Sequence, residues 1–142
     1  MAGFGEALKK GLEAHRRSAE ARKEMDDVLA AASADVAAVT SASISLQFQV
    51  GDRPKREPSL VDIAQHIAAP REKFTALTAL SISGTFRVLG EVTFGELGYP
   101  VTIRWEDRID SAYDRASFEE LIATILAHGA TGKKIAELVT ER

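Results

Sequence analysis

The first forty residues carry a helical pattern. Between Glu6 and Val39 there is no proline and a single glycine, Gly11, and the composition is dominated by good helix formers. The sequence therefore predicts one long helix, or two helices joined by a soft break. Apolar residues recur at helical spacing in two separate stripes. The first stripe is Phe4, Leu8 and Leu12, and the second is Met25, Val28, Leu29, Ala32, Val36 and Val39.

The length of this helix makes the first stripe notable. Residues 13–24 offer only alanines as apolar side chains, so the middle of the helix has little to bury. A helix over residues 5–39 is about 50 Å long, whereas a globule of the remaining hundred residues has a radius of gyration near 13 Å. We expect either an overhanging end that binds a second copy or another protein through Phe4, Leu8 and Leu12, or first turns that fold back on the same domain.

The pattern changes to period two after residue 41. Residues 42–50 place Ile44, Leu46, Phe48 and Val50 on one face and polar side chains on the other, as in a strand with one buried face. Residues 51–58 are polar and contain two prolines, which predicts a solvated loop with a small basic tip. A short helix over residues 60–69 follows, with Ser59 as its cap and Pro70 as its end.

Residues 74–106 predict a β-meander. Its first strand, 74–80, suits a helix equally well from the pattern. Gly90 within the next strand indicates a bulge or a close backbone approach. The apolar residues expected to share the buried face are Phe86, Val88, Val92 and Phe94, then Tyr99, Val101, Ile103 and Trp105.

The C-terminal residues 117–142 predict two helices. Ser117 followed by Glu120 predicts a capping box at the start of the first. Gly129 is expected to end that helix in a left-handed conformation, and Thr131 to cap the second. The expected apolar faces are Phe118, Leu121, Ile122, Ile125 and Leu126 in the first helix and Ile135, Leu138 and Val139 in the second.

Together these elements predict a single α+β domain over residues 1–142. A helical arm, 1–39, precedes a compact body, 40–142. In the body, an antiparallel sheet of three to four strands has one apolar face, covered by the short middle helix and the two C-terminal helices.

Composition narrows the chemistry. The chain has 142 residues, no cysteine and a formal net charge of -3. These values exclude a disulfide framework and a cysteine nucleophile, and they disfavour nucleic acid as a partner. A helix-turn-helix reading of residues 118–140 fails for the same reason, since residues 107–142 hold five Lys/Arg against seven Asp/Glu. No signal peptide or membrane span is apparent, so we expect a cytoplasmic protein with no membrane partner.

No catalytic motif stands out. The sequence has no G-x-S-x-G elbow, and His15, His66 and His128 do not show metal-ligand spacing. Residues 129–134 resemble a phosphate-binding loop, but their glycines are three apart instead of five and follow a helix. We therefore expect a protein that is not an enzyme and needs no cofactor.

One acidic cluster leaves the last strand of the meander: Glu106, Asp107, Asp110 and Asp114. Carboxylates at this density favour a divalent cation, a recognition patch for a basic partner, or a solvated connector whose acids pair with the interleaved Arg104, Arg108 and Arg115.

The sequence is thus most typical of a non-enzymatic protein-interaction module. The first hypothesis is a small neutralising or chaperone-type partner, comparable to a toxin-immunity protein, which covers a basic protein by occlusion. The alternative is a structural subunit of a phage or secretion assembly. A third hypothesis is a metal-dependent hydrolase that uses the acidic cluster and His66.

Overall fold

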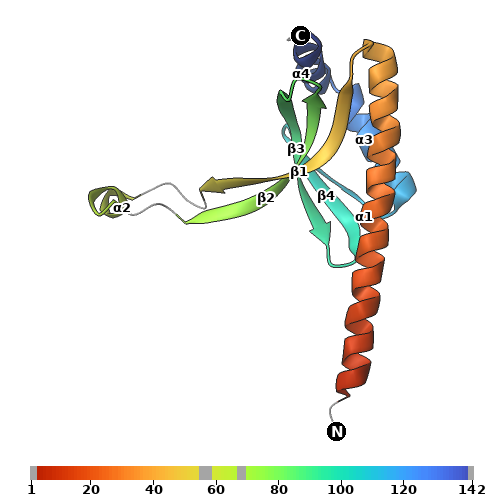
Figure 1. Cartoon of the computed structure of the whole chain (residues 1–142), viewed down its shortest axis with the longest axis vertical. Coiled ribbons are helices and arrows are strands. Elements are labelled where there is room, and N and C mark those ends of the chain that lie inside the picture. Colours follow the sequence, from red (N-terminus) through yellow and green to blue (C-terminus); the bar gives the residue numbers. More distant parts are fainter. Residues whose placement is uncertain (1–2, 55–58, 67–69, 141–142) are drawn as a thin grey trace.

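The computed structural model describes residues 3–54, 59–66 and 70–140, and its fold is α+β (Figure 1). A five-stranded antiparallel meander, in the order β1-β2-β3-β4-β5, is flanked by a long N-terminal helix and two C-terminal helices. The elements are α1 (Phe4–Thr40), β1 (Ile44–Pro54), α2 (Leu60–Ala64), β2 (Arg71–Ser81), β3 (Phe86–Gly95), β4 (Gly98–Trp105), β5 (Arg108–Ala112), α3 (Arg115–Ala127) and α4 (Gly129–Thr140).

Helix α1 is continuous over 37 residues, which decides between the one-helix and two-helix predictions. The second predicted stripe packs into the core: Met25 is fully buried and Val36 is 9% exposed. Val39, in the last turn of the helix, is the exception, at 86% exposed. The second half of α1 therefore belongs to the core, and its first half extends past the body (Figure 1).

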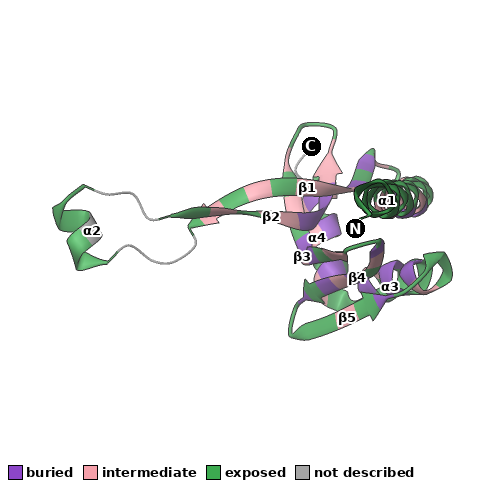
Figure 2. Cartoon of the chain, turned by 90° about the horizontal axis from the view of Figure 1, so that it is seen from below, coloured by how far each residue is buried: buried purple, intermediate pink, exposed green. Residues whose placement is uncertain are grey.

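The sheet is larger than predicted, with five strands instead of three or four. Residues 71–81 form strand β2, and residues 51–54 continue β1 instead of forming a loop, because the two strands pair from Ile44 to Pro54. This long hairpin leaves the body as an arm with α2 at its far end (Figure 2). The predicted middle helix is thus short, Leu60–Ala64, and does not cover the sheet. Lys55, Arg56 and residues 67–69 lie outside the described residues.

The prediction at Gly90 is confirmed in both of its forms. The β2–β3 register shifts between Leu77 and Thr78, which marks a bulge. A Cβ on Gly90 would lie 2.7 Å from Ile103 Cγ2, so β4 approaches too closely for a side chain. The bulge also reverses the faces before it: Phe86 and Val88 are 49% and 43% exposed, contrary to the predicted buried face, and Leu89 is buried instead.

The predicted connector after Trp105 contains a strand. Trp105 pairs with Arg108 across the turn Glu106–Asp107, and β5 continues this pairing to Ala112. The apolar pattern did not reveal β5, because Arg108, Asp110 and Ser111 are polar and Ile109 is 65% exposed.

The C-terminal helices form where predicted, but with other caps. Asp114 caps α3 by accepting from the amide of Ser117 at 2.8 Å, and Ser117 Oγ accepts from the amide of Asp114. The capping box therefore starts three residues before the predicted Ser117–Glu120 pair. Gly129 does not adopt a left-handed conformation. His128 is the one residue between α3 and α4, and its Nδ1 accepts a hydrogen bond from the amide of Ala130 in α4. Thr131 is buried inside α4 and is not a cap.

The core lies between one face of the sheet and α1, α3 and α4. Trp105, Phe118 and Ile103 are among its largest fully buried side chains. Burial of apolar side chains, which contributes about 25 cal/mol per Å² of apolar surface, holds α1 to the sheet. The arm lies outside this core (Figure 2).

Candidate interaction surfaces

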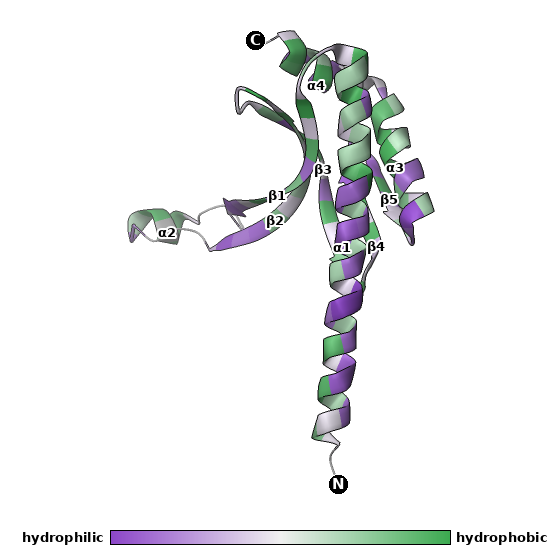
Figure 3. Ribbon diagram, turned by 45° about the vertical axis from the view of Figure 1, so that its right-hand side comes forward, coloured by the Kyte–Doolittle hydropathy of each residue, from purple (hydrophilic) through white to green (hydrophobic). Residues whose placement is uncertain are grey.

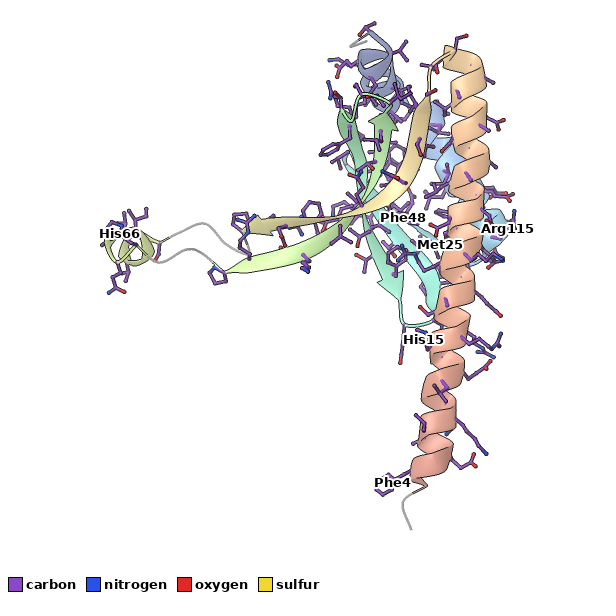
Figure 4. The ribbon with its side chains drawn as sticks, viewed as in Figure 1. Phe4, His15, Met25, Phe48, His66 and Arg115 are labelled. Carbon is purple, nitrogen blue, oxygen red and sulfur yellow. The ribbon has the colours of Figure 1, made fainter. Side chains whose placement is uncertain are left out.

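The first apolar stripe of α1 is exposed at the free end of the helix. Phe4 is 81% exposed, Leu8 63% and Leu12 60%. Phe4 lies at the end that extends away from the body (Figure 4). These turns do not fold back on the domain, so the overhanging end predicted from the helix length is what the structure contains.

The turn between β3 and β4 marks where α1 leaves the body. Gly98 has φ +92°, and a Cβ there would lie 2.4 Å from Ala21 Cβ. One turn earlier, Leu97 borders a shallow groove with Ala14 and Arg17, and the groove continues along α1 past Glu13, Lys10, Lys9 and Glu6. Residues 4–13 therefore project by about 15 Å. At 3.6 residues per turn, Phe4, Leu8 and Leu12 lie roughly 60°, 100° and 140° around the helix from the buried Met25, so the exposed stripe begins beside the core face and turns away from it.

Charged pairs support the projecting turns, which have no core beneath them. Arg16 Nε donates to Glu13 Oε2 at 2.9 Å, and Lys9 pairs with Glu6 at 3.4 Å. The hydrogen bond from Arg16 holds the pKa of Glu13 below its ordinary value. Pairs at three- and four-residue spacing stabilise a solvated helix. Figure 3 shows hydrophobic segments alternating with hydrophilic ones along this part of α1.

The β1–β2 arm carries a second exposed apolar group at its tip. On α2, Leu60 is 85% exposed, Val61 61% and Ile63 62%. Figure 1 shows that the arm and the free end of α1 extend in different directions from the body. The chain thus presents two separated apolar projections, of which only the one on α1 was among the predicted sites.

Arg53, near the outer end of the β1–β2 ladder, clamps the hairpin to β3. Its guanidinium donates to both carboxylate oxygens of Glu91 on β3, at 2.7 and 2.9 Å, and to Glu72 on β2 at 2.8 Å. It also stacks on the Phe74 ring, 4.8 Å from the ring centre. These hydrogen bonds hold the pKa of Glu91 below its ordinary value. The sequence placed Arg53 in a solvated loop, and only the hairpin register brings it opposite Glu72.

The structure assigns internal partners to most of the acidic cluster. Glu106 pairs with Lys134 at 3.5 Å, and Asp110 accepts from Trp105 Nε1 at 2.9 Å and pairs with Arg108 at 3.5 Å.

Asp114 caps α3, and its hydrogen bonds with Ser117 lower its pKa. Asp107 is exposed at the β4–β5 turn. Of the pairs expected in the connector interpretation, the described residues show one, Asp110 with Arg108.

The histidines lie far apart, with His15 on the projecting half of α1 and His66 at the arm tip (Figure 4). His128 packs edge-on against Trp105, with ring centres 5.2 Å apart. Within residues 3–54, 59–66 and 70–140, no group of three or more His, Asp or Glu side chains is placed to hold a metal ion. Among the same residues, no helix is both long and apolar enough to cross a membrane.

No protein-family model, curated protein or solved structure matches this chain. The interaction surfaces are therefore weighed on their own geometry and chemistry.

Proposed function

We propose that this protein is a non-enzymatic protein-interaction module that serves as a structural subunit of a larger assembly. Its contact is the first half of α1, which lays Phe4, Leu8 and Leu12 into an apolar groove of a neighbouring protein. The observation that carries this proposal is the exposure of all three side chains on a helix that extends beyond its own core. An amphipathic helix in an apolar groove is a recurrent mode of recognition.

The size of the stripe supports an assembly over an isolated pair. Full burial of one such side chain contributes about 1.5–3 kcal/mol, so three contribute roughly 5–9 kcal/mol. Association costs an estimated 4–15 kcal/mol in lost freedom of motion. The stripe alone therefore gives weak binding, and a second contact is needed. The apolar tip of the arm, far from α1, is suited to provide it.

In the neutralising or chaperone-type hypothesis, either the acidic connector or the exposed face of the sheet covers a basic partner, and the pairing of the carboxylates bears on the first of these surfaces. Glu106 and Asp110 are paired with cations of their own chain, and Asp114 is engaged in capping. Less free negative charge then faces a basic partner than the sequence suggested. No contact among the described residues favours a one-to-one inhibitor over an assembly subunit.

The test is co-purification of the tagged full chain from its native host. We compare Leu8→Glu with Lys10→Gln, a matched control that changes the net charge by the same single unit on the opposite side of the same turns. The wild type and Lys10→Gln are expected to recover the same partner, and Leu8→Glu to lose it. Equal recovery with all three proteins would contradict the proposal. Both positions are exposed, so equal thermal unfolding of the variants verifies that the fold is intact.

A further inference from the structure

Strand β1 forms one edge of the sheet, and its outer half is part of the arm. Near the body this edge is covered by α1, since the amide of Leu46 donates to Ser33 Oγ at 2.7 Å. Beyond Leu46, no backbone group in the described part of the chain pairs with the edge. An unpaired edge is a ready template for another strand.

The alternation along β1 shows which backbone groups are open. The carbonyl of Gln47 accepts from Thr78 Oγ1 on β2, whereas Leu46 faces Ser33 on the other side. Successive residues of an edge strand turn their N–H and C=O groups alternately toward and away from the neighbouring strand. Phe48, Val50 and Asp52 therefore present theirs outward.

Arg22 of α1 lies beside this edge without a carboxylate partner. Its guanidinium carbon is 5.2 Å from the centre of the Phe48 ring and 4.2 Å from that of Phe94. Its Nε is buried and has no hydrogen-bond partner among the described residues. Arg22 also lines a groove of about 560 Å³ between α1 and residues 45–48 of β1. Asp26 lines the same groove but forms no ion pair with Arg22 among the described residues, so this partly buried cation can still take a carboxylate supplied by a second chain.

Asp52 offers the complementary charge on the same strand. It is exposed, and within the described ranges it forms no ion pair. Lys73 is opposite Asp52 in the β1–β2 register, but the two are not paired. Asp52 and Phe48 are four residues apart, so their side chains share one face of the strand.

We propose that two copies of this chain associate through the outer halves of β1, as antiparallel strands related by a twofold axis at Val50. This register places the second copy's Asp52 directly opposite Phe48, on the same face of the joined sheet. Arg22, which stacks on Phe48, then meets the second copy's Asp52, and symmetry forms the reciprocal pair. Val50, 69% exposed in one chain, packs on its own copy at the axis.

The predicted contact is short, because α1 ends the ladder at Leu46. The surface area that it buries is expected to fall below the roughly 1,200–2,000 Å² of a standard stable interface. The dimer is therefore weak and concentration-dependent in isolation, and it gains strength when a second contact holds the copies in one assembly. It uses no residue of the α1 stripe, so it stands independently of the proposed function.

The experiment is sedimentation velocity of the full chain at rising concentration up to about 1 mM, the weak end of measurable affinities. The wild type is expected to form dimers. Asp52→Arg and Arg22→Asp each raise the dissociation constant about hundredfold, because the dimer contains two symmetric Arg22–Asp52 pairs and the loss of each raises the constant roughly tenfold. The double variant Arg22→Asp/Asp52→Arg restores the dimer. Asp107→Arg, an exposed carboxylate at the β4–β5 turn, leaves the equilibrium unchanged.

Amide hydrogen exchange supplies a second readout that a structural role of these residues would not change. In the dimer, the amides of Phe48, Val50 and Asp52 exchange slowly, whereas dilution to the monomer exposes them. Those of Gln47 and Gln49 face β2 and stay protected in both states.

A chain that remains monomeric at about 1 mM, or a double variant that stays dissociated while folded, overturns the proposal. If Arg22→Asp unfolds the chain, Val50→Lys replaces it, since Val50 is exposed and two lysines at the axis repel each other. Dimers that persist in Val50→Lys likewise overturn it. If the wild type stays monomeric but Leu8→Glu still loses its partner in the co-purification, the dimer proposal is refuted and the proposed function is not.

Discussion

The close approach of the β3–β4 turn to α1 gives a sharp test of how the projecting helix is held. Gly98 and Gly84 both have φ +92°, but their surroundings differ. A Cβ on Gly84 would meet nothing within 4 Å, whereas a Cβ on Gly98 would lie 2.4 Å from Ala21 Cβ and 3.4 Å from the carbonyl oxygen of Ser18. The two glycines therefore separate the cost of the conformation from the cost of the packing.

The expected losses follow from these two terms. Alanine in the left-handed region costs about 1–2 kcal/mol, and Gly84→Ala should lower the free energy of unfolding by this amount and no more. Gly98→Ala carries the same cost and adds about 1–3 kcal/mol for an overpacked contact. Its total of roughly 2–5 kcal/mol is a large part of the stability of a domain this size, about 5–15 kcal/mol. Both variants should still fold.

The assay is equilibrium unfolding in urea for both variants, for Ala21→Gly and for the double variant Ala21→Gly/Gly98→Ala. Removing the Ala21 methyl opens space for the new one, so the double variant should lose less than the sum of the single losses, with a coupling of about 0.5–3 kcal/mol. Equal losses for Gly84→Ala and Gly98→Ala, or strict additivity with Ala21→Gly, would show that the turn does not hold α1 by close contact.

Two further predictions concern polar groups. Burial raises the pKa of Tyr99 to about 12, and its hydroxyl has no hydrogen-bond partner among the described residues. Tyr99→Phe should therefore raise the free energy of unfolding, measured in urea, by about 1 kcal/mol. A destabilised variant would reveal a partner for the hydroxyl. The pKa of Glu91 is depressed in the folded protein, so its pairing with Arg53 stabilises the fold above the ordinary carboxyl pKa of 4.5 and is lost as pH falls through the lower folded value. Arg53→Met should remove this part of the pH dependence, measured as unfolding free energy at about pH 7 and about pH 3, and an unchanged acid limb would contradict the clamp.

Local patterns predicted the parts of the fold that depend on local physics. The helical spacing of Met25, Val28 and Leu29 identified the face of α1 that packs on the sheet, and all three are buried. The alternation from Tyr99 to Trp105 identified the inner face of β4. The length argument left two possibilities for the first turns of α1, an overhanging end or turns folded back on the domain, and the structure contains the first.

The errors arose where distant residues decide the structure. Phe86 and Val88 face outward because a bulge opposite Leu77 reverses the strand, which the alternation of β3 alone does not reveal. β5 exists because β4 offers it an edge, although its own residues are mostly polar. At the N-terminus of α3, the Asp114 carboxylate takes the capping role assigned to Ser117. The Arg53 clamp needs three strands in register before its partners meet.

The central claim is that the exposed stripe of α1 is a docking surface. Its most direct test is site-specific photo-crosslinking of the full chain in its native host, with the reactive side chain placed at Leu8, Leu12 or the control position Lys10. We expect one partner protein to be captured from Leu8 and Leu12, and far less from Lys10 on the opposite side of the helix. Equal capture at all three positions, or capture from Lys10 alone, would contradict the assignment of this face.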